Sequence, residues 1–578
     1  PQNAEGCCGR GDECWINLNN ITQKKNTFHY IALTLQKQYE NQLRSSTSLH
    51  TKHLLDPSLS NVESVCEEVR ASTDKASQTR ILFHYNGHGM PEATDLGEIW
   101  VFNKRYDKFK PVPISLIHSW LRTPTLYVID CSCAGYLLNH LMDLNTDAME
   151  DETRDLLFLG ACDCEEKLAI SADFPADLFT ACLTDPLRVS IRWYLHIRGI
   201  QPFSLTNCLQ ADDNIEEDFA YRLVGGNYDR NLPRGKLRMV FDCITDCMAW
   251  NVCDMETYKM LFKTDEMVAA LFRNFLLAQR IMPVFNCHPV SKPAFPDLSN
   301  HPLWRTWDAV VEDFILQYSQ AQRLAFSLSD QLSSSGDLSL SHLQEDKKPE
   351  YFYIQQKPAA SHSAALATNK PIPAGNGTFS FHTPFFRSTI QELYTFIRVS
   401  HDYSVIPESF SMLSQILNSG EMSQHLTGNQ SVNVLELLAD FAERSTDAVI
   451  AVLNSINFTS LKRISFKAQK NHRSSLLRLW TSIAAFDFHV HEDYMQNLFI
   501  FLVSFLASDA DPVPTSDDLC RVLYLLVIAC HENDLSRAKC KENGIPLLVK
   551  NYLKSHNWKL RCLCCILLSQ LCYERNEL

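Results

Sequence analysis

Over residues 1–315, short apolar runs alternate with segments of helical periodicity. Three runs of five residues are each followed by a polar or glycine-containing turn: Ile81–Tyr85, Thr125–Ile129 and Leu156–Gly160. Runs of this length and composition predict strands that are buried on both faces of a parallel sheet. Helical patterns cover Ser60–Arg70, Ile114–Leu121 and Ala176–Ile197. The alternation predicts an α/β domain over residues 1–315.

The remaining residues divide into two further regions. Residues 316–377 are rich in Ser, Gln, Ala, Pro and Lys, which predicts a flexible low-complexity insertion. Residues 378–578 have helical patterns almost throughout, with apolar helices expected over Leu519–Cys530 and Lys559–Cys572, and another beginning near Pro546. The first two are about 40 residues apart, a spacing that resembles the armadillo repeat. We expect an all-α solenoid of armadillo or HEAT type that is incomplete at its C-terminal end.

Composition and charge exclude some of the classes to which the protein could belong. A chain of 578 residues is too long for one hydrophobic core, and 53 basic against 67 acidic residues give a net charge of −14. This balance argues against sequence-independent nucleic-acid binding, which needs clustered Lys and Arg. The nearest approach to a membrane span, Tyr494–Leu506, falls short of the roughly 20 apolar residues required. The 21 cysteines, an odd number with many in apolar runs, predict reduced, buried thiols and a cytoplasmic protein.

Candidate chemistry follows two neighbouring strands. His84-Tyr85-Asn86-Gly87-His88-Gly89 follows one run, and Asp130-Cys131-Ser132-Cys133-Ala134-Gly135 follows the next. Because the carboxyl ends of parallel strands meet at one edge of a sheet, a histidine and a nucleophile can come together there. The layout resembles that of caspase-type proteases. One hypothesis is therefore a cysteine or serine peptidase that uses His88 with Cys131 or Ser132.

The alternative is a degenerate site, and the register of the motif favours it. In the metacaspase-like pattern Asp-Ser-Cys-His-Ser-Gly the nucleophile is the third residue, and that position is Ser132 here. Cysteines stand on either side, but neighbouring side chains of an extended turn point in different directions. Serine is a poor nucleophile in a site adapted to a thiolate of low pKa. We therefore interpret His88, Ser132 and Cys131 as vestigial dyad positions without catalytic function.

Other motifs receive structural interpretations. Cys131-x-Cys133 and Cys162-x-Cys164 could in principle share a zinc ion. The cysteine pairs of structural zinc sites usually have two to four residues between them, whereas each pair here has one, and we favour ordinary thiols. Cys562 and Cys565 have Cys-x-x-Cys spacing, but we expect them in the core of an apolar helix. His301, Trp304 and Trp307 predict an aromatic anchor of domain packing. No glycine-rich phosphate loop occurs, and we predict no cofactor and no metal site.

Longer stretches carry a resemblance to a known family, the Raptor scaffold subunits of TOR complex 1. The matching stretches are Glu13-Cys14-Trp15-Ile16, Leu35-Gln36-Lys37-Gln38-Tyr39-Glu40, Leu55-Asp56-Pro57-Ser58, Leu82-Phe83-His84-Tyr85-Asn86-Gly87-His88-Gly89, Gly97-Glu98-Ile99-Trp100-Val101-Phe102-Asn103-Lys104, Pro175-Ala176-Asp177-Leu178-Phe179-Thr180, Ile244-Thr245-Asp246-Cys247-Met248-Ala249-Trp250-Asn251 and Leu271-Phe272-Arg273-Asn274-Phe275-Leu276-Leu277-Ala278. The match is tight over residues 12–310 and looser from His382 to the end.

The resemblance implies a caspase-like domain, an armadillo-type solenoid and a C-terminal propeller, and the propeller has no counterpart in these 578 residues. It implies a non-enzymatic adaptor that binds the TOR kinase and recruits substrates through a short TOR-signalling motif beginning with Phe. It also suggests small GTPases as partners of the solenoid and recruitment to the lysosomal or vacuolar surface through partners. The helices from Pro384 to Phe441 are candidates for the peptide site, with no single pocket residue assigned.

Overall fold

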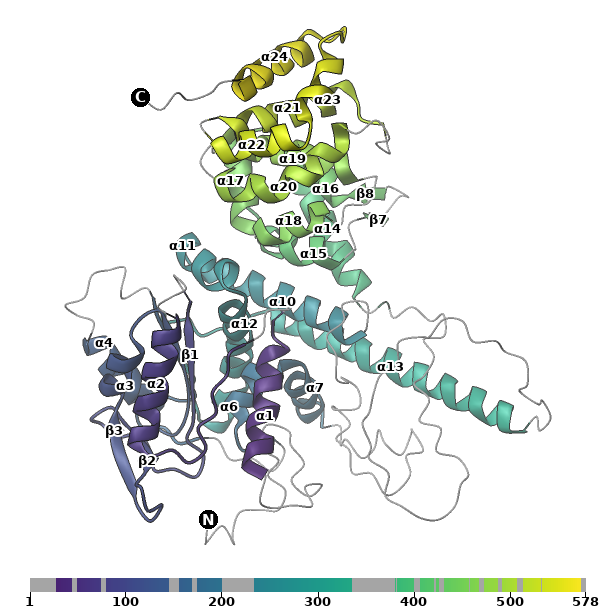
Figure 1. The fold of residues 1–578 in the computed structure, drawn as a ribbon. Helices are drawn as coiled ribbons and strands as arrows, with labels where there is room; N and C mark the ends of the chain where they lie inside the picture. Colours follow the sequence, from purple (N-terminus) through teal and green to yellow (C-terminus); the bar gives the residue numbers. More distant parts are fainter. Residues whose placement is uncertain are drawn as a thin grey trace, which may run out of the picture. The chain divides into compact units, whose positions relative to one another are not determined.

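The computed structural model divides the chain into two compact units (Figure 1). The first comprises Pro1–Met248 and Met260–Phe381, and the second comprises Ala249–Lys259 and His382–Leu578. The residues that the structure describes are 27–43, 49–73, 79–144, 155–168, 174–199, 233–334, 380, 382–399, 406–419, 423–425, 431–456, 458–466, 472–486, 491–506, 513–531 and 533–572.

The first unit is built on a four-stranded sheet in the order β1-β4-β5-β6. The strands are β1 (Ile81–Asn86), β4 (Thr125–Asp130), β5 (Leu156–Gly160) and β6 (Val290–Lys292). β1, β4 and β5 are parallel, and β6 runs antiparallel to β5. The three predicted strands and their parallel pairing are confirmed. Every residue of β4 and β5 is buried, which explains why their sequences are apolar without alternation.

Helices and a separate hairpin accompany this sheet. The hairpin consists of β2 (Glu98–Phe102) and β3 (Phe109–Pro113). The helices are α1 (Thr27–Glu40), α2 (Leu59–Thr73), α3 (Ile114–Leu121), α4 (Ala134–Leu144), α6 (Leu178–Thr184), α7 (Pro186–Ile197), α10 (Pro233–Val252), α12 (Glu266–Ile281) and α13 (Leu303–Ser334). The single helical pattern expected over Ala176–Ile197 is two helices, because Asp185 leaves the helical region and Pro186 begins the next helix.

The expected boundary of the low-complexity insertion is wrong at its N-terminal side. The composition predicts that the insertion starts at residue 316, but α13 continues as a helix to Ser334. The composition of residues 316–334, rich in Gln, Ala, Leu and Ser, includes good helix formers, and these extend the apolar pattern that begins at Trp304. Residues 335–377, the rest of the predicted insertion, lie outside the described part of the chain.

One described segment, Glu266–Phe285, is long and apolar enough to cross a membrane by length and composition. It consists of α12 and the short turn after it, and 78% of its apolar window is buried within the fold. α12 packs against α6 and α7. Its position in the protein core accounts for its hydropathy. The described segment nearest to a membrane span by length and composition is therefore this one and not Tyr494–Leu506, which the sequence suggested.

The second unit is almost entirely helical, as predicted. Its helices are α11 (Met255–Lys259), α14 (Thr383–Val399), α15 (Leu413–Ser419), α16 (Val434–Ala442), α17 (Thr446–Ser455), α18 (Phe458–Phe466), α19 (Arg473–Phe486), α20 (His491–Leu506), α21 (Ser516–Cys530), α22 (Asp534–Glu542), α23 (Ile545–Tyr552) and α24 (Trp558–Cys572). A short hairpin, β7 (Ser423–His425) with β8 (Ser431–Asn433), interrupts them. Pro546 lies in the first turn of α23, as expected.

Equivalent helices of this unit stack in a row. α16 packs on α19, α19 on α21, and α21 on α24, and Figure 1 shows α21 to α24 at one end of the stack. An ion-pair network runs along the same row: Arg478 on α19 lies 2.7 Å from Asp440 on α16, and its Nε lies 3.0 Å from Glu443. Arg521 on α21 lies 3.4 Å from Glu443. Repeating helix pairs that contact only their neighbours are typical of a solenoid.

The prediction that the Cys-x-x-Cys pair of α24 lies in the core is wrong. Cys562 and Cys565 are exposed, whereas Cys564 is buried. The buried positions of α24 are Leu560, Cys564, Leu567 and Leu571, which follow helical periodicity along one face. The apolar composition of the helix continues onto the opposite face, so composition alone could not identify the buried side.

Candidate functional site

The candidate site lies at the carboxyl ends of β1 and β4, which are adjacent parallel strands. The last residues of the two strands, Asn86 and Asp130, are in register. In the turn after β1, the N–H of Gly87 donates to the carbonyl oxygen of Asp130 at 2.8 Å. A Cβ atom on Gly87 would lie 2.6 Å from the Cβ of Cys131, so the close approach of the two turns requires glycine at this position. The structure thus brings the two predicted motifs together.

His88 and Asp130 form the polar centre of the site. His88 Nε2 lies 3.3 Å from Asp130 Oδ1, and the Asp130 side chain is fully buried. The other carboxylate oxygen accepts hydrogen bonds from Thr180 N at 3.1 Å and Thr180 Oγ1 at 2.5 Å. Burial acts to raise the pKa of Asp130, but the interactions with His88 and Thr180 outweigh it, so the pKa lies below its usual value. Asp130 is therefore a stably ionised partner of His88.

Ser132, in the predicted nucleophile position, is held by backbone groups. Its Oγ accepts a hydrogen bond from the N–H of Leu168 at 3.1 Å, and its carbonyl oxygen accepts one from the N–H of Ala93 at 3.1 Å. Both contacts tie together segments that follow different strands. Ser132 thus has a structural role in the turn.

Cys131 is placed unfavourably for nucleophilic chemistry. Its side chain is 2% exposed, and burial raises the pKa of its thiol well above the usual value, with Cys162 and Asp130 adding to the effect. The reactive form of cysteine is the thiolate, so a buried thiol with a raised pKa is a poor nucleophile at neutral pH. Of the three candidate positions, His88 pairs with Asp130 rather than with Cys131.

The four cysteines considered for zinc have separate partners. Cys133 Sγ lies 3.5 Å from Glu92, which also binds Lys167 at 2.6 Å, and burial raises the pKa of Cys133 to about 11. Cys162 Sγ donates to the carbonyl oxygen of Cys131 at 3.3 Å, whereas Cys164 Sγ accepts from Asn139 at 3.2 Å. Among the described residues, no group of three or more His, Cys, Asp or Glu side chains is arranged to hold a metal ion.

The tryptophans of the predicted aromatic anchor are core residues. Trp304 is 3% exposed and its Nε1 donates to the carbonyl oxygen of Leu298 at 2.8 Å. Trp307 is 1% exposed and packs edge to face on Phe241, with ring centroids 5.1 Å apart. The packing interpretation is confirmed.

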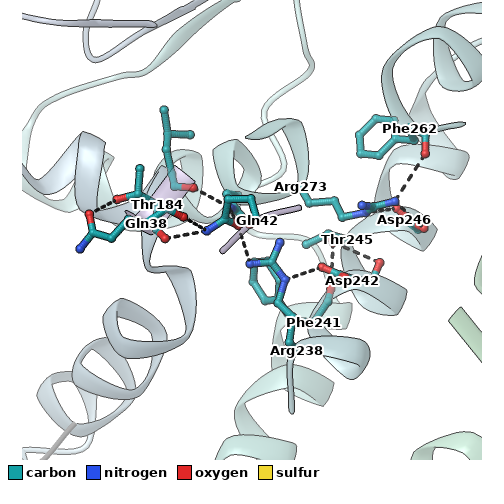
Figure 2. A network of polar contacts seen from close by, with 12 residues as sticks. Gln38, Gln42, Thr184, Arg238, Phe241, Asp242, Thr245, Asp246, Phe262 and Arg273 are labelled. Carbon is teal, nitrogen blue, oxygen red and sulfur yellow. Dashed lines mark hydrogen bonds and ion pairs between the residues drawn. The ribbon is translucent and has the colours of Figure 1, made fainter. Parts of the chain in front are cut away.

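A buried polar network extends from the site through α6 (Figure 2). Thr184, one turn after Thr180, donates to Gln38 at 3.0 Å, and its carbonyl oxygen accepts from Gln42 at 2.7 Å. Gln42 Oε1 in turn accepts from Arg238 at 3.0 Å. The network connects α1, α6 and α10 and fixes the helix that carries the Asp130 contact.

A second part of this network lies between α10 and α12. Arg273 Nε donates to Asp246 Oδ1 at 2.6 Å, and Lys263 lies 3.5 Å from the same carboxylate. All three side chains are buried, and Figure 2 shows Arg273 directed at Asp246. A buried carboxylate with two cationic partners fixes the packing of these helices.

Sequence reasoning missed several residues of the site. The role of Asp130 could have been inferred from its position in register with the strand that precedes His88. The contribution of Thr180 could not, because it lies 50 residues further along the chain. His84, whose Nδ1 lies 2.8 Å from the Tyr39 hydroxyl, is a third such residue, and its partner comes from α1.

Comparisons with known proteins agree with this geometry. Residues 9–141 match the family described as the Raptor N-terminal CASPase like domain. The crystal structure of Raptor from Chaetomium thermophilum superposes with a TM-score of 0.69 and 27% identity, covering 98% of this chain and 46% of that chain. The resemblance to Raptor is confirmed. The fold class follows: a caspase-like α/β domain precedes an armadillo- or HEAT-type helical solenoid.

Relatives from a plant and from a yeast also resemble this chain. The "Regulatory-associated protein of TOR 1" of Arabidopsis thaliana is 38% identical over 349 residues, covering 58% of this chain and 24% of that protein. The "Target of rapamycin complex 1 subunit KOG1" of Saccharomyces cerevisiae is 28% identical over 532 residues, covering 82% of this chain and 33% of that protein. The chain therefore spans between a quarter and a third of the length of these Raptor relatives.

Proposed function

We propose that this chain is the adaptor region of a TOR complex 1 scaffold, which binds the TOR kinase and recruits substrates that carry a Phe-led TOR-signalling motif. The observation that carries the proposal is the match to a TOR complex 1 subunit of yeast over 82% of the chain, which includes both units. The fission-yeast relative mip1 is also named as a TOR complex 1 subunit. Such a scaffold would act by tethering the substrate, which raises the effective concentration of the substrate near the kinase.

The proposed adaptor is non-enzymatic, and three features of the candidate site support this. Serine occupies the nucleophile position, the neighbouring Cys131 is a buried thiol with a raised pKa, and His88 is engaged by Asp130. A cysteine or serine peptidase would need a nucleophile within hydrogen-bond reach of its base. Without a catalytic role, the domain would serve as a rigid binding surface.

The helices α14 to α16 remain the candidates for peptide recognition. A Phe-led peptide needs an apolar pocket with one or two polar anchors. This segment contains an aromatic cluster in which Phe410 lies 5.6 Å from Phe396 and 5.3 Å from Phe441 between ring centroids. Such a cluster would give a rigid wall to an adjacent pocket.

The proposal extends to partners and location. Small GTPases would bind the solenoid, whose stacked helices provide an extended surface. The protein would act in the cytoplasm and reach the lysosomal or vacuolar surface through its partners.

A pull-down tests the proposal directly. The full chain is immobilised and offered TOR kinase, a Phe-led motif peptide, and the same peptide with Phe replaced by Ala. We expect retention of the kinase and of the intact peptide, with the substituted peptide lost. Equal retention of both peptides would contradict recruitment through the motif, and failure to retain the kinase would contradict the scaffold role.

The peptidase alternative has its own test. An electrophilic activity-based thiol probe is applied to native and denatured protein, followed by peptide mapping. We expect Cys131 to react only after denaturation, because its thiol is buried. Labelling of Cys131 in the native protein alone would return the hydrolase to consideration.

A further inference from the structure

Two buried thiols contact each other in the solenoid, outside the candidate site and with no part in the proposed function. Cys530 is the last residue of α21, and Cys540 lies in α22. Their sulfur atoms are 3.5 Å apart, and the side chains are 0% and 1% exposed. A disulfide has an S–S distance of about 2.05 Å, so a small approach of the two helices would bring the sulfurs within bonding distance.

The helix that carries Cys540 is loosely attached to the protein. Of the nine residues of α22, only Arg537 and Cys540 are buried. Its one large apolar residue, Leu535, is 66% exposed. A helix with so little buried apolar surface detaches locally at low free-energy cost, and each opening exposes the thiols to solutes. Burial of the pair therefore does not prevent reaction with a small oxidant.

The surroundings make the two sulfurs unequal. The thiol of Cys540 hydrogen-bonds Cys530, and this contact together with the nearby charge of Arg537 holds the pKa of Cys530 below its usual value, against the effect of burial. The same contact and burial raise the pKa of Cys540. Cys530 is thus the member of the pair that more readily forms the thiolate, the form that reacts with oxidants.

We infer that Cys530 and Cys540 form a reversible redox modification site, in which a hydroperoxide converts the two thiols into an intramolecular disulfide that clamps α22 onto α21. The Cys530 thiolate attacks hydrogen peroxide, forming an S–O bond and breaking the O–O bond, and the expelled hydroxide takes up a proton to give water. The Cys540 sulfur then attacks Cys530, forming the S–S bond and releasing the oxygen as a second water. The two sulfurs lose two electrons, which the peroxide gains.

Peptide mapping of the full chain tests the site. The protein is treated with hydrogen peroxide, its remaining thiols are alkylated, and the digest is analysed without reduction. We expect peptides joined through Cys530 and Cys540, lighter by two hydrogen atoms than the reduced pair, and their separation by dithiothreitol. Hydrogen exchange provides a second readout: amides of α22 should exchange about tenfold more slowly in the oxidised protein, because the clamp suppresses local opening.

Matched variants separate this site from general oxidation. Cys540→Ser should abolish the cross-link and leave Cys530 as a sulfenic acid that a dimedone probe captures. Cys564→Ser, a buried thiol of the neighbouring α24, should leave the cross-link intact. Unchanged hydrogen exchange of α19 and α21 in both variants would show that they fold. Peroxide that oxidises the exposed Cys562 and Cys565 without joining Cys530 to Cys540 would overturn the inference, as would a cross-link that leaves α22 exchange unchanged.

Discussion

The imidazole of His88 lies against the carboxylate of Asp130, with 3.3 Å between Nε2 and Oδ1. Asp130 is the last residue of β4 and precedes the nucleophile position by two residues. Because its other oxygen is held by Thr180 at the start of α6, the carboxylate is fixed from two sides. The histidine of a catalytic layout is here hydrogen-bonded to a buried carboxylate that connects strand to helix.

Restoring a thiol at the nucleophile position should not restore peptidase activity. In Ser132→Cys, the base His88 remains held by Asp130, and the new side chain would occupy the site where Ser132 accepts the Leu168 N–H. We expect no peptide cleavage and no labelling by a cysteine-protease probe above that of the unsubstituted protein. The measurement is probe labelling of native protein followed by peptide mapping.

A double substitution controls this result. Labelling of Ser132→Cys that disappears when His88→Ala is added would mean that His88 activates a thiol there, and the non-enzymatic proposal would be wrong. Labelling that survives His88→Ala would indicate only an accessible thiol.

His84 should make the α/β unit sensitive to mild acid. Burial lowers the pKa of His84 to about 4, whereas an unfolded histidine titrates near 6.5. The folded state therefore favours the neutral imidazole, so this contribution to stability is complete above pH 6.5 and declines as the pH falls from 6.5 towards 4. Between pH 7.5 and pH 5 the unit should lose about 2 kcal/mol through His84. Hydrogen exchange of β1 and β4 amides at the two pH values measures this loss of stability.

Two histidine variants isolate that contribution. In His84→Gln the loss of stability between pH 7.5 and pH 5 should shrink by about 2 kcal/mol, although the variant is less stable at neutral pH because the hydrogen bond between Tyr39 and His84 Nδ1 is lost. His140→Gln, which alters a histidine bonded to the Asp95 carbonyl oxygen, should keep the pH profile of the unsubstituted protein. Identical profiles for all three proteins would refute the assignment to His84.

Gln42 should be a sensitive point of the polar network. Gln42→Leu removes the acceptor of Arg238 and Asn274 and the donor to the Thr184 carbonyl oxygen, all within the core. Buried polar groups without partners cost about 1–3 kcal/mol each, so we expect a loss of at least that size in the α/β unit. Urea unfolding of the full chain measures this loss of stability, and hydrogen exchange of α6 and α10 locates it.

Gln36→Leu is the matched control, because the side-chain amide of Gln36 donates to Glu40 Oε1, one turn along the same helix, at 2.7 Å. Its effect should stay within about 0.5 kcal/mol, the usual range for a local side-chain pair. Equal effects of the two substitutions would mean that the network adds no stability beyond helix α1.

The strands of the α/β domain could be predicted because burial on both faces leaves an unbroken apolar run. Ile81–Tyr85, Thr125–Ile129 and Leu156–Gly160 each correspond to a strand of the parallel sheet. The end of α13 could not be predicted in the same way. Its sequence after residue 316 is polar enough for a linker, yet its residues are also good helix formers, and composition does not decide between the two.

The candidate site was predictable only in part, for a physical reason. His88, Cys131 and Ser132 follow strand ends, and the topology of a parallel sheet brings strand ends together. Their partners come from distant segments: Thr180 from α6 and Leu168 from the turn after β5. Which nucleophile a histidine faces depends on such partners, and a strand pattern contains no information about them.

Arg478 should be the key cation of the solenoid, because it joins α19 to Asp440 and Glu443 of the α16 region. These side chains are less than half exposed, and the Arg478 contacts hold the pKa of Glu443 below its usual value. Arg478→Gln should destabilise α16 and α19 by about 1 kcal/mol, with a smaller loss in 1 M salt, where screening already weakens the ion pairs.

Arg398→Gln is the control. It breaks a 3.3 Å ion pair with Asp440, but the Arg398 side chain is 49% exposed, so the loss of stability should be less than about 0.5 kcal/mol. Hydrogen exchange of α16 and α19 amides compares the stability of the two variants. A larger loss of stability in Arg398→Gln would show that contact with Glu443 is not what stabilises the stack.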